Sequence, residues 1–400
     1  MFLPLLAALA LALTTAKLAG WLSGRLGQPV VLGKLLAGLV LGPSILNVFG
    51  LPYFAQAHVV DALYEFGELG VIFLMFSAGL EIQLADLMRA GRPAVLAGIL
   101  GVVAPIGLGL AVLLPFGYDV TQAMFLGLVM AATSVSISAQ TLMELGRLRS
   151  REGLTLLGAA VVDDVLAIGA LSVFLALVLG DGEGGPLALI WIFVRMLLFL
   201  AGAYLLGSWL LPRLVHWLEG RRLPISEPVI SLVIIVILLF AWASEVVGGV
   251  AAITGAFIAG VALSGSASKE KIERGLRAIA FAFFVPLFLV SLGLRADART
   301  LSAGDFGLVA VICVVAIASK VLGAGGGARL GGMAWPAALR VGVGMVSRGE
   351  VGLIVASVGV GAGVLDASGF TAVVLMVLVT TLATPPLLRL VFSRQEREHA

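Results

Sequence analysis

Residues 158–168 read GAAVVDDVLAI, a run that places two adjacent carboxylates, Asp163 and Asp164, inside an otherwise apolar segment. If the segment is a helix that begins near Glu152, Asp163 lies roughly 16 Å along it, at about 1.5 Å per residue. That depth is near the centre of a bilayer whose hydrocarbon core is about 30 Å thick. A charge there costs at least about 2.5–3.5 kcal/mol, so it rarely persists without a partner or a role. The segment therefore predicts a membrane helix that carries a functional site.

The composition of the whole chain agrees with a membrane protein. Of its 400 residues, 60% are hydrophobic and 12% are charged, whereas soluble domains carry about 25% charged residues. Apolar runs of about twenty residues, each long enough to span a bilayer as a helix, recur along the chain. We therefore predict an all-α polytopic membrane protein with about thirteen transmembrane helices. The expected helices cover residues 2–24, 28–50, 59–82, 92–114, 121–145, 152–180, 187–212, 226–246, 248–265, 274–294, 304–327, 334–361 and 366–392.

The charge of the loops predicts how the chain is oriented. Basic residues are concentrated in alternate loops, such as 147–151 and 269–277, whereas the other set of loops carries only Arg295 and Arg299. Because basic loops tend to remain cytoplasmic, the N-terminus is expected outside and the C-terminus inside. An odd number of helices requires the same arrangement. The net charge of +2 gives no indication of a nucleic-acid partner.

Two polar, small-residue interruptions divide the expected helices 121–145 and 334–361. They read MAATSVSISA at 130–139 and GMVSRGEVG at 344–352. Each lies in the middle helix of a triplet, and the two triplets enter the membrane from opposite sides. This is the pattern of the inverted repeats found in many secondary transporters. A broken helix leaves backbone amides and carbonyls unpaired and sets two half-helix dipoles against each other.

Polar side chains at the two interruptions are candidates for the site. The hydroxyls of Thr133 and Ser134 can provide the hard oxygen ligands that a desolvated sodium ion prefers. They can equally bond the backbone of their own helix, and for any single hydroxyl we favour this second interpretation. At the second interruption, Arg348 and Glu350 are two positions apart and do not share a helix face. They are expected to neutralise the dipole ends at the break or to brace helix packing.

The two aspartates are expected to have different neighbours, because adjacent positions on a helix point about 100° apart. They therefore cannot share a proton as the pair of an aspartic protease does. One can pair with a fixed cation, while the other faces a cavity and binds an ion or a proton. Lys320 lies near the membrane centre in the expected helix 304–327 and is a candidate partner for Asp163. A static salt bridge and a pair that opens when a cation enters both fit the sequence.

Several segments together resemble the bacterial monovalent cation:proton antiporters of the NapA and Kef type. They are LGQPVVLGKLLAGLVLGPSIL at 26–46, ATSVSISAQTLMELG at 132–146, VVDDVLAI at 161–168, ASKVLGAGGGA at 318–328 and GMVSRGEVGLIVA at 344–356. The resemblance covers nearly the whole chain in the same order. It implies an NhaA-like fold, in which a core domain of two inverted triplets with crossing broken helices moves against a dimerisation domain.

The resemblance also implies a division of the chain. Residues 1–91 would form the first part of the dimerisation domain and residues 226–294 its second part. Residues 92–180 would form the first core triplet, and residues 295–400 the second core triplet with a short tail. Residues 181–225 would form a helix that links the two halves.

The same resemblance implies roles for single residues. Asp164 would be the main carboxylate that binds the cation and the proton, and Asp163 would be the partner of Lys320. The remaining candidates would lie at the helix crossings: Thr133 and Ser134 at the first, and Glu350 at the second.

Two departures from the resembling proteins refine this interpretation. Kef-type potassium systems usually carry a cytoplasmic nucleotide-binding domain and lack the first aspartate of the pair. Here Asp163 is present and only SRQEREHA, at 393–400, follows the last expected helix, so the electrogenic sodium/proton branch is the better match. In addition, Ser347 stands where NapA-like proteins often have proline, and the sequence does not predict what this changes.

We therefore predict a homodimeric sodium/proton antiporter of the bacterial inner membrane that works by alternating access. Na⁺ or Li⁺ and protons would compete at Asp164 and cross in opposite directions, with no ATP, no cofactor and no enzymatic activity. The alternatives are a potassium/proton antiporter of the Kef type, a passive cation channel and an intramembrane aspartyl protease. The absence of a repeated pore loop argues against a channel. A protease would need aspartates that converge from two helices, whereas these two are consecutive.

Overall fold

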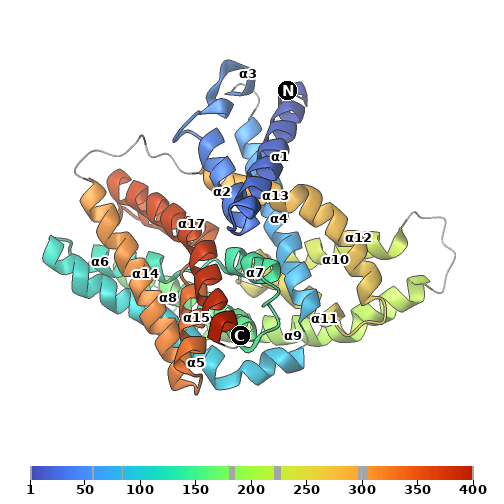
Figure 1. The fold of residues 1–400 in the computed structure, drawn as a ribbon. Coiled ribbons are helices and arrows are strands. Elements are labelled where there is room, and N and C mark those ends of the chain that lie inside the picture. Colours follow the sequence, from blue (N-terminus) through green and yellow to red (C-terminus); the bar gives the residue numbers. More distant parts are fainter. Residues whose placement is uncertain are drawn as a thin grey trace.

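The structure, a computed structural model, describes residues 2–55, 58–82, 84–179, 185–219, 227–295, 299 and 305–398 (Figure 1). Throughout these residues the regular elements are helices, and no strand is present. The expected all-α architecture is therefore confirmed for this part of the chain. The α-helices are α1 (Phe2–Arg25), α2 (Val30–Leu41), α3 (Pro52–Ala55), α4 (Val59–Glu81), α5 (Leu84–Leu113), α6 (Val120–Ala131), α7 (Val135–Glu144), α8 (Arg151–Leu179), α9 (Gly185–Glu219), α10 (Pro228–Ala243), α11 (Ala252–Leu263), α12 (Lys269–Ile279), α13 (Val285–Leu294), α14 (Asp305–Leu330), α15 (Trp335–Gly344), α16 (Glu350–Gly361) and α17 (Ala367–Glu398).

The apolar helices have the lengths that a bilayer requires. Nine helical segments within the described residues are long and apolar enough to cross a membrane. Shorter apolar helices accompany them, among them α2 and α11. The number of about thirteen transmembrane helices stays a prediction. The nine segments are Phe2–Arg25, Ala90–Phe116, Val120–Glu144, Arg151–Leu171, Ile190–Glu219, Pro228–Gly248, Lys269–Leu294, Gly307–Leu330 and Ser368–Ser393.

The prediction of a helix over 28–50 is wrong in its second half. α2 ends at Leu41, and Gly42 is extended, with φ −74° and ψ 178°. The reason is Pro43, which has no backbone N–H and disfavours a helical conformation at the residue before it. α2 is therefore 12 residues long, which at 1.5 Å per residue is about 18 Å and well short of a bilayer.

Two other helices begin earlier than predicted. The expected helix 274–294 starts at Lys269 as α12 and continues through a π-helical turn, Ala280–Phe284, into α13. The expected helix 92–114 is the second part of α5, which is kinked at Gly91 with φ 43° and ψ −129°. Glycine adopts this backbone conformation readily because it lacks a Cβ atom.

The helices pack in two groups. The first helix group contains α5, α6, α8, α14 and α15, with α5 packed against both α8 and α14. The second helix group contains α1, α2, α4, α11 and α13, with α4 packed against both α11 and α13. Figure 1 shows α6, α8 and α14 on the opposite side of the molecule from α10 and α12. The division into a core domain and a dimerisation domain that move against each other stays a prediction.

Glycines on α14 bring its backbone into direct contact with α5. A methyl group at Gly327 would lie 2.2 Å from the carbonyl oxygen of Leu96, and one at Gly323 would lie 2.4 Å from that of Leu100. Small residues allow this close approach of two membrane helices. The approach positions Lys320, one turn before Gly323 on α14, in the interior of the first helix group.

Candidate functional site

The two interrupted helices meet at their breaks. Residues 132–134 separate α6 from α7, and residues 345–349 separate α15 from α16. The backbone N–H of Ser134 in the first break donates to the carbonyl oxygen of Ser347 in the second, at 2.9 Å. Two backbone groups that have no partner within their own helices are therefore paired with each other. The polar interruptions recognised in the sequence thus lie side by side.

A glycine makes this close crossing possible. A methyl group at Gly349 would lie 2.6 Å from both Cβ and Oγ of Ser134, so no larger residue fits there without movement of the break. Ser138, one turn along α7, donates from Oγ to the carbonyl oxygen of Gly344 at 2.5 Å. The crossing is therefore held by contacts on both sides of each break.

Arg348 is fully buried and is bonded mainly to backbone carbonyls. Its guanidinium donates to the carbonyl oxygens of Met345 and Val346 at 2.9 and 3.0 Å, and to that of Ala316 on α14 at 3.1 Å. Thr381 of α17 donates to the carbonyl oxygen of Arg348. The positive charge lies at the carboxyl end of α15, where the helix dipole is negative. The contacts fit both roles expected for this residue, neutralisation of a dipole end and bracing of neighbouring helices.

Asp163 forms a buried ion pair with Lys320. Lys320 Nζ donates to Asp163 Oδ1 at 2.6 Å, and both residues have 0% of their surface exposed. Gly101 of α5 closes one side of the pair, because a methyl group there would lie 3.3 Å from the carboxylate oxygen. The second oxygen, Asp163 Oδ2, is buried and has no hydrogen-bond partner in the described part of the chain. The pairing that the sequence allowed is therefore present, and its role in transport stays a prediction.

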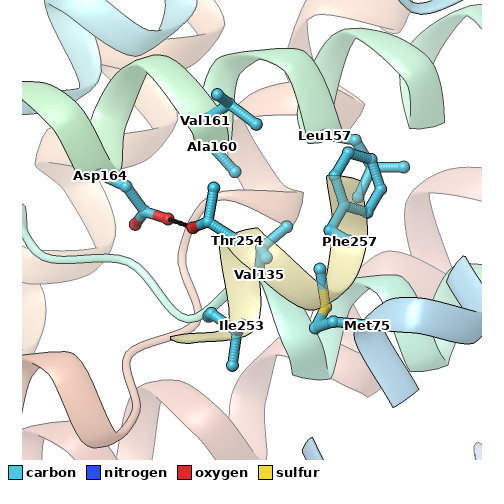
Figure 2. A pocket seen from close by; sticks show the side chains of 9 residues that line it. All are labelled: Met75, Val135, Leu157, Ala160, Val161, Asp164, Ile253, Thr254 and Phe257. Carbon is cyan, nitrogen blue, oxygen red and sulfur yellow. Dashed lines mark hydrogen bonds between the residues drawn. The ribbon is translucent and has the colours of Figure 1, made fainter. Parts of the chain in front are cut away.

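Asp164 faces a different environment from Asp163. It is partly exposed and accepts a hydrogen bond from Thr254 Oγ1 of α11 at 3.2 Å. Figure 2 shows the two side chains pointing toward each other at the edge of a small pocket. The pocket has about 270 Å³ of empty space including its open mouth, and four helices contribute to it. Its lining residues are Met75, Val135, Leu157, Ala160, Val161, Asp164, Ile253, Thr254 and Phe257.

The pocket lies where the two helix groups meet. Asp164 comes from α8 of the first group, whereas Met75 and Thr254 come from α4 and α11 of the second. Apart from Asp164 and Thr254, the lining side chains are apolar. Electrostatic interactions are stronger in apolar surroundings than in water, so these neighbours screen the charge of Asp164 only weakly. Lys320 also interacts electrostatically with the partly exposed Asp164, more weakly than with Asp163.

The other predicted site residues lie at the crossing rather than in this pocket. Thr133 Oγ1 donates to the carbonyl oxygen of Ala131 at 3.3 Å, within its own segment. Ser134 Oγ is 2.9 Å from Ser136 Oγ. Both hydroxyls are buried. That of Thr133 bonds nearby backbone, as we favoured, whereas that of Ser134 bonds another side chain. Glu350 is the first residue of α16, and its side chain lies outside the described residues.

Thr254 was missed in the sequence, although a local signal was present. It is the one polar side chain in α11, which reads AITGAFIAGVAL. A lone threonine in an apolar helix usually bonds its own backbone, so its contact with Asp164 depends on how α11 packs. Arg340 was also missed, because its partner is distant in the sequence. It pairs with Glu152 at 2.8 Å and so connects α15 to α8.

The chain is similar to several known proteins over nearly its whole length. Residues 12–392 match the family described as "Sodium/hydrogen exchanger, transmembrane". The chain is 38% identical over 389 residues to the Na(+)/H(+)-K(+) antiporter GerN of Bacillus cereus, covering 97% of this chain and 96% of GerN. It is 34% identical over 421 residues to the high-affinity Na(+)/H(+) antiporter NhaS3 of Synechocystis, covering 96% and 89% of the two chains. The sodium proton antiporter MjNhaP1 of Methanocaldococcus jannaschii shares the fold, with a TM-score of 0.67, 18% identity and coverage of 97% and 96%.

Proposed function

The chain belongs to the sodium/hydrogen exchanger family of monovalent cation:proton antiporters, and on that premise we propose that it exchanges sodium ions for protons at Asp164. The protein is a membrane transporter and not an enzyme. The observation that carries the proposal is the contrast between the two adjacent carboxylates. Asp163 is sealed against Lys320, whereas Asp164 is partly exposed in a pocket between the two helix groups.

Competition for one carboxylate explains how the two fluxes are coupled. Asp164 binds either a sodium ion or a proton, because both neutralise the same charge in an apolar surrounding. The carboxylate then crosses the membrane barrier in one direction with sodium and in the other direction with a proton. A movement of the first helix group against the second would open the pocket to each side in turn. Such alternating access uses no ATP and no cofactor.

The ion pair beside the site gives a reason for electrogenic transport. Lys320 interacts electrostatically with both aspartates. A cation at Asp164 repels the ammonium group of Lys320 and weakens its bond to Asp163. Lys320 then releases a proton as the cation enters and regains it as the cation leaves. Each cycle would therefore move more than one proton for each sodium ion, and the exchange would respond to voltage.

The surroundings of the protein follow from the same proposal. We place it in a bacterial inner membrane as a homodimer, with the N-terminus outside and the C-terminus in the cytoplasm. The second helix group would form the contact between the two subunits and stay fixed in the bilayer. Basic loops that follow alternate helices support this orientation.

Proton flux in liposomes tests the proposal. The purified protein is reconstituted, and the internal pH is followed while sodium, lithium or potassium is added in turn, with and without an imposed voltage. Sodium and lithium should each drive proton movement that saturates with concentration. Cation flux that needs no proton counter-flow would identify a passive channel instead.

Potassium is the second candidate cation. GerN, which is similar over nearly the whole chain, is described as a Na(+)/H(+)-K(+) antiporter, so potassium can take part in transport within this family. The carboxylate oxygens of Asp164 do not by themselves discriminate between the two ions. Proton movement driven by potassium alone would assign this second function.

A further inference from the structure

The hydrogen bond between Thr254 and Asp164 joins the two helix groups at the ion site. Thr254 Oγ1 donates to Asp164 Oδ2 at 3.2 Å. The donor lies on the third residue of α11, in the second helix group, and the acceptor lies in the middle of α8, in the first helix group. A movement of one group against the other must break this bond.

The donor is held on a rigid part of the second group. A methyl group at Gly255 would lie 2.1 Å from the carbonyl oxygen of Phe240 on α10, and one at Gly260 would lie 2.2 Å from that of Phe76 on α4. α11 is therefore packed backbone to backbone against two neighbours. Thr254 itself is only 5% exposed. The hydroxyl cannot follow Asp164 if α8 moves.

The bond also depends on the charge of Asp164. A hydroxyl bonds an ionised carboxylate roughly twice as strongly as it bonds a neutral group. In addition, Asp164 lies beside the first turn of α11, where the positive end of the helix dipole favours a negative charge. A proton or a sodium ion at the carboxylate neutralises that charge and weakens both interactions. The contact is therefore strongest when the site carries neither ion.

We propose that Thr254 is a coupling residue that holds the unloaded, ionised Asp164 against the second helix group and releases it when sodium or a proton binds. This inference rests on the proposed function, because it assumes exchange at Asp164. An exchanger must prevent its empty site from crossing the membrane, since an empty site that crosses lets sodium leak without protons. The Thr254 hydroxyl supplies that restraint, and it positions the carboxylate without itself carrying the ion.

Sodium efflux at alkaline pH tests the proposal. Liposomes containing the protein and labelled sodium are diluted into sodium-free buffer of the same alkaline pH, with the voltage clamped. Few protons are available to bind Asp164 after it releases sodium. The site of the wild-type protein should therefore remain at the outer face, and sodium efflux should stop. Thr254→Val keeps the shape of the side chain and removes the hydroxyl. In this variant the site without an ion should cross back to the inner face and bind the next sodium ion. Its efflux should be roughly tenfold faster or more, the scale of one hydrogen bond to a charged group. Thr254→Ser restores the hydroxyl and should stall.

Sodium–sodium exchange separates coupling from binding. This exchange never requires the empty site to cross, so the wild type and Thr254→Val should perform it at similar rates. Thr155→Val is the matched control, because the Thr155 hydroxyl bonds its own helix at Arg151, 2.7 Å away. Sodium efflux by Thr155→Val at alkaline pH should stop as it does in the wild-type protein. Thr254→Ala is measured in the same way in case the valine variant does not assemble.

Two results would overturn the proposal. The first is a Thr254→Val protein that exchanges sodium for sodium normally but still stalls at alkaline pH. The second is loss of sodium–sodium exchange in folded Thr254→Val and Thr254→Ala proteins, which would make Thr254 a sodium ligand. A wild-type protein without sodium-driven proton flux would instead refute the proposed function, so the two failures are distinct.

Discussion

Lys320 Nζ lies 2.6 Å from Asp163 Oδ1, while the next residue along the helix, Asp164, turns away from this pair and bonds Thr254. The divergence follows from helix geometry, since consecutive side chains point about 100° apart. The two adjacent aspartates therefore lie in different environments. Asp163 is in a buried ion pair inside the first helix group, and Asp164 is partly exposed where the two groups meet. This arrangement leads to the predictions below.

Replacing Asp164 by asparagine should abolish exchange. The amide neither gains nor loses a proton and carries no charge to attract sodium, so sodium-driven proton flux in liposomes should fall to the level of empty vesicles. Asp61→Asn is the control, because the side chain of this aspartate is 70% exposed and forms its ion pair with the exposed His58. Cation-driven proton flux retained by Asp164→Asn would show that the carboxylate is not the shared site.

Replacing Lys320 by glutamine should destabilise the protein and remove its response to voltage. The change leaves the buried Asp163 carboxylate without its ion-pair partner, which costs about 3–5 kcal/mol. The double variant Lys320→Gln with Asp163→Asn removes both charges and should recover most of that loss. Thermal unfolding in detergent measures the stability of the three proteins. Wild-type transport that ignores an imposed voltage would contradict the electrogenic role of Lys320.

Replacing Gly349 by alanine should disturb the crossing of the broken helices. The added methyl group would lie 2.6 Å from Ser134 Cβ, so one break has to move. Overpacking of this kind costs about 1–3 kcal/mol, and we expect a lower melting temperature together with slower transport. Gly326→Ala is the matched control, because a methyl group there meets nothing within 4 Å. Equal effects of the two substitutions would argue against a tight crossing.

Acidification should weaken sodium binding without changing the maximal rate. If a proton and sodium compete for one carboxylate, the apparent KM for sodium rises by at least about tenfold for each pH unit once most sites hold a proton, by mass action, and more steeply where Lys320 releases a second proton. Initial rates over a grid of sodium concentration and pH measure this. A maximal rate that falls at constant KM would instead place the proton at a separate site.

Much of the fold was readable from the chain. Apolar runs of bilayer length predict the helices, and the polar breaks at 130–139 and 344–352 coincide with the two interruptions observed. These features depend on residues close in sequence, so local rules describe them well. α2 was predicted too long because apolar residues continue past Pro43, although this proline ends the helix.

By itself, then, the sequence determined which segments are apolar enough to span a membrane, where the two central helices break and that Asp163, Lys320 and Arg348 are buried, because the cost of placing an apolar or ionised group in a bilayer belongs to the residue and its neighbours in the chain. Only the tertiary structure decided what each charge meets. Asp163 and Lys320 are 157 positions apart, and Asp164 and Thr254 are 90 positions apart. Hydrogen bonds act over about 3 Å, so such partners exist only where helix packing brings distant segments into register.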